Sequence, residues 1–201
     1  MVLPLEFYWN HDVVQVAQSL LGKLLVTEIG GKRTSGIIVE TEAYAGITDK
    51  ASHAYGNRKT HRTTTMFAQG GVAYVYLCYG IHHLFNVVTN VQEVPHAVLI
   101  RAIEPVDGID IMMARRKKKK FNNTLTAGPG LMSEALGIKT IHTGMSLQQA
   151  PIFIEEGGYD VEPNNIISTT RVGVNYAAED ALLPYRFLLK DNKFLSKGKG
   201  L

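Results

Sequence analysis

The chain has 201 residues, of which 45% are hydrophobic, and a formal net charge of +3. This length suits one substantial hydrophobic core and is short for two, so we expect a single domain over residues 1–201. No apolar run approaches the roughly 18 to 20 residues of a membrane span, and the amino terminus lacks the basic and apolar regions of a signal peptide. We therefore expect a soluble, cytoplasmic protein.

One cysteine, Cys78, excludes an intramolecular disulfide framework and a cysteine-based zinc cluster. Its neighbours in residues 74–79 are aromatic and aliphatic, which is typical of a strand and favours a buried, inert thiol over a reactive one. The seven histidines include no His-Glu-x-x-His spacing, and the chain has neither Gly-x-Gly-x-x-Gly nor a phosphate loop. We expect no metal and no cofactor.

The amino-terminal part of the chain predicts a helix followed by a strand. Asn10 is a suitable N-cap for a helix over residues 13–21, where apolar residues recur at helical spacing, and Gly22 is placed to end it. A strand over residues 23–28 follows.

A glycine pair at residues 30–31 predicts a turn into a β-branched strand over residues 36–45. Strict alternation along this strand places four residues on one face: Ile38, Glu40, Glu42 and Tyr44. That face carries two carboxylates and an aromatic ring. The next segment, residues 46–70, is polar and rich in Thr, Arg, His and Gly, so we expect a long ordered loop of functional importance.

Two strands over residues 72–79 and 83–89 follow in quick succession, and the turn between them predicts a tight hairpin. Aromatic residues gather here and in the preceding loop and strand: Tyr44, His53, Tyr55, Tyr74, Tyr76 and Tyr79. Any two could be core residues, but a cleft with a carboxylate, an arginine and stacking rings suits an enzyme that acts on a flipped nucleotide. Tyr79, at the hairpin tip, is expected to project outward as a wedge in a distorted duplex.

Arg101 interrupts an apolar strand over residues 96–103. A guanidinium group there cannot lose its water without a carboxylate or several acceptors nearby, and Glu40 and Glu42 are the candidates on a neighbouring strand. A carboxylate held by an arginine suits a general base at neutral pH. A purely structural buried ion pair is the alternative.

A helix over residues 106–118 is expected to carry the basic run 115–120 at its carboxyl end, where cations are favoured. The run supplies six positive charges, so the rest of the chain sums to −3. Such a run suits an anionic polymer such as nucleic acid, and a solvated helix end explains it equally well.

The carboxyl-terminal part predicts a helix over residues 131–136 after Gly128-Pro129-Gly130, and a disordered tail over residues 197–201. Short strands are expected over residues 152–155, 168–172 and 185–189. Together the elements predict the α+β class: a single domain with a mixed, mostly antiparallel sheet, flanking helices and a protruding β-hairpin.

Several segments occur in the order of one known family, and the most specific are residues 39–44, 74–80 and 101–105. On these motifs, and on collinear matches over nearly the whole chain, the sequence resembles the alkyladenine (3-methyladenine) DNA glycosylases in a bacterial form. The resemblance implies a monomeric, monofunctional enzyme that flips alkylated or deaminated purines out of duplex DNA and hydrolyses their N-glycosidic bond, which initiates base excision repair. It does not rank 3-methyladenine, 7-methylguanine, hypoxanthine and ethenoadenine.

The resemblance also assigns the catalytic groups. Glu42 matches the general base, and Arg101 and the carbonyl of Val172 match the groups that hold the nucleophilic water. A carboxylate suits this reaction because it stabilises a sugar with oxocarbenium character and takes a proton from water. None of the family's motif positions is Lys here, so no lyase activity is expected.

For the substrate, the resemblance implies that Tyr44, His53 and Tyr76 stack around the flipped base. Asn86 matches the residue that obstructs the exocyclic amino group of normal guanine, and Tyr79 matches the residue inserted through the minor groove. Further DNA contacts are expected at Ile81, Arg58, Lys59, Thr60 and Met66.

Two departures from the family pattern stand out. Leu131 occupies a position where many relatives carry Lys, which weakens a lysine contact to phosphate, and His82 and His83 replace more apolar or aromatic residues. The alternative function is a non-catalytic damage-binding or structural module, which has no use for Glu42 beside Arg101 in an anionic ligand's pocket. An RNA-modifying enzyme is disfavoured because no RNA-binding signature is present.

Overall fold

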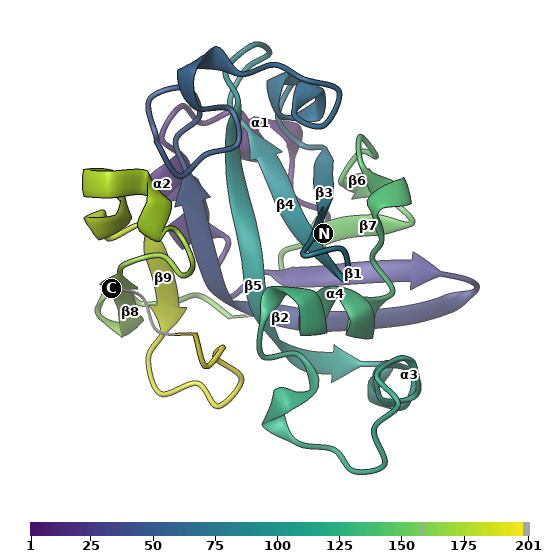
Figure 1. The fold of residues 1–201 in the computed structure, drawn as a ribbon. Helices are drawn as coiled ribbons and strands as arrows, with labels where there is room; N and C mark the ends of the chain where they lie inside the picture. The colour runs from purple at the N-terminus through teal and green to yellow at the C-terminus, as the bar shows by residue number, and fades with distance from the viewer. Residues whose placement is uncertain (158, 199–201) are drawn as a thin grey trace.

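The fold is built around one curled sheet, in which the long strands β2 and β5 run side by side (Figure 1). The computed structural model describes residues 1–157 and 159–198. Its main path has the strand order β3-β4-β5-β2-β1-β7-β6, and β9 pairs with both β2 and β8. The strands are β1 (Leu24–Ile29), β2 (Lys32–Tyr44), β3 (Ala73–Cys78), β4 (His82–Thr89), β5 (His96–Asp107), β6 (Gln148–Gln149), β7 (Ile152–Glu155), β8 (Ile166–Thr169) and β9 (Arg186–Leu189).

Every strand pair among the described residues is antiparallel. The α-helices of this part of the chain are α1 (Leu5–Tyr8), α2 (Val13–Ser19), α3 (Ile109–Arg115) and α4 (Pro129–Leu136). Helix α2 packs against β2 and β5, whereas α4 packs against β4 and β5. The structure therefore confirms the α+β class with flanking helices and a protruding hairpin, and the sheet is antiparallel rather than mixed.

The core is formed by apolar side chains of the sheet and the packed helices. Val16 of α2, Phe85 of β4, Ile100 of β5 and Met132 of α4 belong to one cluster of buried residues. No described helix has the length and apolar character needed to cross a lipid bilayer.

Helix α2 begins at Val13 as predicted and ends at Ser19, but Asp12 and not Asn10 is its N-cap. The Asp12 carboxylate accepts hydrogen bonds from the backbone N–H groups of the first turn, at 2.9 and 3.1 Å, and Asn10 accepts from the Asp12 N–H. Gly22 follows the helix with φ +81°. A Cβ there would lie 2.5 Å from the carbonyl oxygen of Tyr159, so this position requires glycine.

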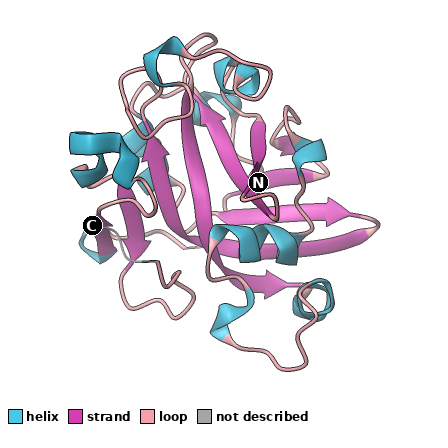
Figure 2. Cartoon of the chain, in the orientation of Figure 1, coloured by secondary structure: helices cyan, strands magenta, loops and turns pink. Residues whose placement is uncertain are grey.

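The predicted turns and strands of the central sheet are confirmed with shifts of a few residues. Gly30 and Gly31 have positive φ and join β1 to β2 as a two-residue hairpin. The segment between β2 and β3 is ordered and contains only loops and the short 3₁₀ helices η1 (Tyr55–Asn57) and η2 (Thr64–Phe67) (Figure 2).

Helix α3 is shorter than predicted and does not carry the basic run. Strand β5 continues to Asp107, and after Arg116 the chain leaves the helix because Lys117 takes φ +51°. The Lys117 N–H donates to the Ala114 carbonyl and the Lys118 N–H to the Met113 carbonyl, which is the Schellman arrangement of a helix end. The lysines therefore follow the helix in a loop.

Arg115 and Arg116 have structural partners. The Arg115 guanidinium donates to the carbonyls of Ile29 and Ala135, and Arg116 pairs with Glu134 at 2.6 Å. These contacts account for part of the basic run without nucleic acid.

Two further expectations need correction. Strand β8 ends at Thr169, so Val172 lies in a bend beyond the strand, where its backbone N–H is not engaged in the ladder.

Cys78, at the end of β3, is half-buried rather than buried. Burial raises the pKa of its thiol, which keeps the thiol protonated. In the tail, Gly198 packs near Val172 and Arg101, and residues 199–201 of the predicted disordered segment lie outside the described residues.

Candidate active site

Glu42 lies on β2 with a fully buried side chain whose two oxygens have different partners. Its Oε1 accepts a hydrogen bond from the Val172 N–H at 2.7 Å and forms an ion pair with Nη1 of Arg101 at 3.1 Å. Its Oε2 accepts from the Tyr44 hydroxyl at 2.9 Å. Burial and the neighbouring carboxylate raise the pKa of Tyr44 well above its ordinary value, so the hydroxyl stays a donor. Three donors from different parts of the chain thus fix the Glu42 carboxylate.

Glu40, two residues earlier on the same face, anchors Arg101 from the other side. Its Oε1 accepts from Nε of Arg101 at 2.6 Å, from Nε of Arg186 at 2.9 Å and from the Ser196 hydroxyl at 2.8 Å, and its Oε2 accepts from the Ser196 N–H at 2.7 Å. Burial alone would raise the pKa of Glu40, but the two guanidinium charges and the Ser196 N–H hold it below the ordinary value. The predicted partners of Arg101 are therefore confirmed.

A backbone irregularity helps to place Arg101 between the two carboxylates. The β2–β5 register pairs Glu40 with Ala102 and Thr41 with Ile100, so Arg101 has no direct partner across the ladder. Such an irregularity re-aims a side chain relative to the regular pleat. The Arg101 side chain is only 6% exposed and bridges Glu40 and Glu42.

A small pocket lined by aromatic side chains lies beside this carboxylate. Its walls are Tyr44, Ala51, His53, Met66, Tyr74, Tyr76, Asn86, Ala97 and Tyr176. The rings of His53 and Tyr76 meet edge to face with centroids 4.7 Å apart, and those of Tyr74 and Tyr76 are tilted at 5.7 Å. Since Tyr44 also donates to Glu42, the pocket and the carboxylate share one wall.

His53 is held as a neutral ring between the Arg62 guanidinium on one side and the Tyr74 hydroxyl on the other. Nε2 lies 3.2 Å from Nη2 of Arg62, and Nδ1 lies 3.0 Å from the Tyr74 hydroxyl. Because guanidinium can only donate, Nε2 accepts and the proton sits on Nδ1. Burial, then the charges of Arg62 and Arg58, lower the pKa of His53 to about 4. At neutral pH the ring is a fixed wall of the pocket rather than a proton donor.

Asn86 is buried in β4, and its amide orientation is determined by the backbone. Its Nδ2 donates to the carbonyls of Tyr74 at 3.0 Å and Leu84 at 3.3 Å. Two carbonyl acceptors require the NH₂ group on that side, so the side-chain carbonyl is the group available to the pocket.

The hairpin tip is apolar and exposed. Tyr79 and Gly80 both have positive φ, and the Ile81 N–H donates to the Cys78 carbonyl to close the turn. Tyr79 is 90% exposed and Ile81 70% exposed. An exposed tyrosine at a tip buries no surface within the protein, which is consistent with insertion into a partner.

The comparisons with known proteins agree with this geometry. The model of the family described as "Methylpurine-DNA glycosylase (MPG)" matches residues 6–193. The chain belongs to this family. Three bacterial relatives named "Putative 3-methyladenine DNA glycosylase" are similar to it over almost their full length. They are from Chlamydia felis (50% identity, 96% of this chain and 98% of the relative), Clostridium acetobutylicum (45%, 98% and 98%) and Bacillus cereus (45%, 98% and 100%).

Family membership makes the chain a DNA glycosylase, a hydrolase of DNA repair. The alternative of a binding module without catalysis is therefore set aside. In the part of the chain that the structure describes, no group of three or more His, Cys, Asp or Glu side chains is arranged to hold a metal ion.

The remaining DNA-contact candidates of the glycosylase occupy two different environments. Arg58 and Thr60 line an open groove next to the aromatic pocket, together with Lys50, Arg62 and Tyr176. Lys59 is paired with Glu93 at 2.7 Å on the surface. Met66 is 2% exposed and lines the aromatic pocket, so it lies inside the protein rather than on its surface.

The structure also explains the two departures from the family pattern. Leu131 lines a surface groove beside Tyr79 at the start of α4. His83 accepts a hydrogen bond from the Thr140 N–H at 3.3 Å, and His82 packs against Gly130, so both histidines join β4 to the following helical segments.

Sequence reasoning missed several groups that hold the glycosylase site together. Ser196 and Arg186 complete the Glu40 cluster, and Arg171 and Asp49 form a buried ion pair behind Tyr44. Tyr176 lies in the walls of both the pocket and the groove. No local pattern predicts the partner of Arg171, because the three residues before it, 168–170, are Ser and Thr.

Proposed function

We propose that this glycosylase excises alkylated or deaminated purines from duplex DNA by hydrolysis, with Glu42 as the general base. The observation that carries the proposal is the buried Glu42 carboxylate, held by Arg101, Tyr44 and the Val172 N–H beside an aromatic pocket. A buried carboxylate next to a surface for flat rings combines the two requirements of N-glycosidic bond hydrolysis, a base for water and a site for the flipped nucleobase.

The contacts of Glu42 suggest which oxygen takes the proton. Oε1 already receives the Val172 N–H and faces Arg101, whereas the Tyr44 hydroxyl is the one donor to Oε2 among the described residues. A carboxylate oxygen has two lone pairs, so Oε2 retains one for a water molecule. The negative carboxylate also stabilises the positive charge that develops on the sugar.

The pocket suits damaged purines in particular. Purines alkylated on a ring nitrogen carry a positive charge, and the faces of Tyr44 and Tyr76 attract a cation stacked on them. The described pocket walls contain no lysine, so they offer no amine nucleophile for a lyase reaction. We expect hydrolysis to leave an intact abasic strand.

The direct test is excision from four duplexes that carry 3-methyladenine, 7-methylguanine, hypoxanthine or ethenoadenine. We expect release of at least one of these bases, with strand breaks only after alkali treatment, and the same rate in the presence of EDTA. Release of none of the four by the folded protein would overturn the proposed substrate class. Strand cleavage without alkali would contradict the hydrolytic mechanism.

Asn86→Ser is expected to relax discrimination against guanine. Asn86 is buried and its side chain is fixed by the carbonyls of Tyr74 and Leu84, so a smaller residue opens space at the position where a guanine amino group would lie. Rates on guanine and 7-methylguanine should rise relative to hypoxanthine in matched duplexes. Unchanged relative rates would refute the steric role.

Tyr79→Ala is expected to weaken the flipped complex by about 1 to 3 kcal/mol, the scale of one base–aromatic contact. The 90% exposed ring is placed to fill the gap left by the flipped nucleotide, and it makes no contact with Glu42. The defect should be smaller opposite a mismatch, because that base costs less to extrude. A fluorescent base reporter in single-turnover excision separates flipping from hydrolysis, and equal losses on paired and mismatched lesions with normal flipping would show that Tyr79 is not the wedge.

We further propose that residues 1–201 form one glycosylase domain that acts as a cytoplasmic monomer on chromosomal DNA. Every group of the site described above comes from this one chain, so no second copy is needed to complete it. Light scattering after size-exclusion chromatography, with and without a lesion duplex, tests the oligomeric state.

A further inference from the structure

We propose that Asp49 is a positioning residue of the excision reaction, which acts through Arg171 to hold the Val172 N–H on Glu42. The inference rests on the proposed function, since it concerns Glu42, the general base of that reaction.

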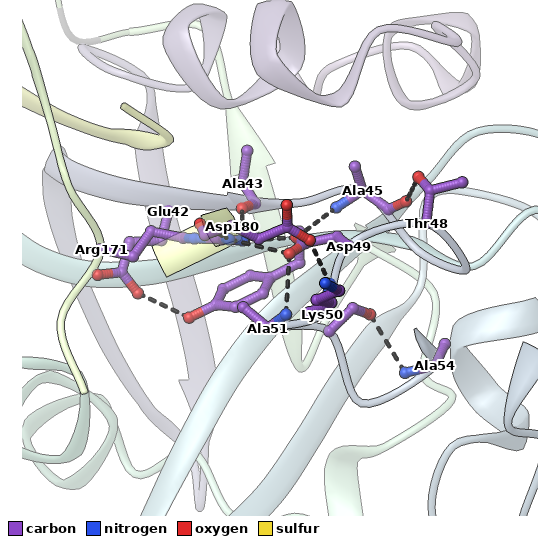
Figure 3. Close-up of polar contacts among 12 residues, drawn as sticks. Glu42, Ala43, Ala45, Thr48, Asp49, Lys50, Ala51, Ala54, Arg171 and Asp180 are labelled. Atoms are coloured by element: carbon purple, nitrogen blue, oxygen red, sulfur yellow. Dashed lines mark hydrogen bonds and ion pairs between the residues drawn. The ribbon is translucent and has the colours of Figure 1, made fainter. Parts of the chain in front are cut away.

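The Asp49–Arg171 pair is nearly inaccessible to solvent and has almost ideal geometry. Nη1 of Arg171 donates to Asp49 Oδ2 at 2.5 Å and Nη2 to Oδ1 at 2.9 Å, with side-chain exposures of 0% and 1%. The Asp49 carboxylate also accepts from the N–H groups of Ala45 at 3.0 Å and Ala51 at 2.9 Å, as Figure 3 shows. A bidentate pair of this kind fixes both position and orientation.

The two Nη groups of Arg171 also fix the backbone on either side of the site. Nη1 donates to the Ala43 carbonyl of β2 at 2.9 Å, and Nη2 donates to the Asp180 carbonyl at 3.0 Å (Figure 3). The guanidinium lies over the Tyr44 ring, 4.9 Å from its centroid, and on the other side 5.4 Å from that of Tyr185. One buried cation thus joins β2, the loop after it and the segment that follows β8.

Two of the three donors that hold Glu42 depend directly on this cation. Val172 is the next residue after Arg171, lies outside any strand, and donates its N–H to Glu42 Oε1 at 2.7 Å. Tyr44, which donates to Oε2, has its ring against the Arg171 guanidinium. Because Val172 lies outside the strands of the sheet, the Asp49–Arg171 pair next to it restrains the direction of its peptide.

The residue after Asp49 offers a matched control. Residue Lys50, next to Asp49, forms an ion pair with Glu179 at 2.5 Å, but Glu179 is 70% exposed and contacts none of the groups around Glu42. Glu179→Gln therefore removes a carboxylate from the same loop contact without touching Arg171. Exposed pairs of this type contribute little to stability.

The experiment is single-turnover excision of hypoxanthine from duplex DNA over a range of enzyme concentrations. It compares wild type, Asp49→Asn, the double variant Asp49→Asn/Arg171→Met, and Glu179→Gln. Asp49→Asn leaves the Arg171 charge buried and unpaired, which can prevent folding, whereas the double variant removes both charges and is expected to fold.

If the Asp49–Arg171 pair positions the Glu42 carboxylate, Asp49→Asn and the double variant should lower the maximal rate on the order of 10- to 10²-fold. The half-saturating enzyme concentration should change by about two-fold or less. Glu179→Gln should resemble wild type in both readouts.

The proposal is overturned if the folded double variant keeps the wild-type maximal rate, because the pair then serves only stability. Failure of the proposed function itself looks different, since wild type would then excise no hypoxanthine and none of the other three lesions.

Discussion

Glu42→Gln is expected to retain lesion binding and to lose excision by on the order of 10²-fold or more, the contribution of a general base. The amide has the shape of the carboxylate and still offers one oxygen to the Val172 N–H and Arg101. Its nitrogen then faces the Tyr44 hydroxyl, at the oxygen position that we assign to the attacking water. The variant can neither take the water's proton nor stabilise a cationic sugar.

The measurement is single-turnover excision, with binding followed separately by fluorescence anisotropy on the same lesion duplex. Glu28→Gln is a suitable control, because Glu28 is an exposed carboxylate paired with Arg33 at 3.0 Å, far from the pocket residues in the sheet. It should behave as wild type. A Glu42→Gln rate within a few fold of wild type would sink the assignment of the base.

Alternation along one strand was sufficient to predict the face that carries the buried carboxylate cluster. Glu40, Glu42 and Tyr44 follow each other at intervals of two, and the structure places their side chains in one connected cluster with Arg101. The prediction that Arg101 needs a carboxylate follows from the apolar sequence around it, since burying an unpaired guanidinium in such a strand costs too much desolvation free energy. Local periodicity and the cost of desolvation are both properties of short segments, so a sequence reveals them.

Contacts between distant segments were not predictable in this way. Ser196 reaches Glu40 from the carboxyl-terminal end, and Asp49 meets Arg171 across 122 positions of the chain. Neither residue differs locally from an ordinary polar loop residue. The role of Val172 illustrates the same limit, because its N–H is free for Glu42 only where β8 ends, and that end is set by tertiary packing rather than by local propensity.

Glu40→Gln is expected to lower the free energy of unfolding by about 3 to 5 kcal/mol at neutral pH, the cost of removing one partner from a buried ion pair. Arg101 and Arg186 would then keep their charges in buried surroundings, with an amide in place of the carboxylate they share. Urea unfolding of wild type and Glu40→Gln at neutral pH measures the difference in the free energy of unfolding. Glu28→Gln, which breaks an exposed ion pair, should change the free energy of unfolding by about 1 kcal/mol or less.

The pH dependence of that difference distinguishes a charge effect from a packing defect. In the folded protein, burial raises the pKa of Glu40, but the guanidinium groups of Arg101 and Arg186 lower it by more than burial raises it. The pKa of Glu40 therefore lies below the ordinary value of about 4.3. A carboxyl with a lowered folded-state pKa stabilises the protein above its unfolded pKa, and this stabilisation disappears as the pH falls through the folded pKa. The difference in the free energy of unfolding between wild type and Glu40→Gln should therefore be largest at neutral pH. It should decrease progressively below about pH 4, because a protonated carboxyl is as neutral as the amide. A difference that stays constant down to about pH 3 would show that Glu40 acts through shape rather than through its charge.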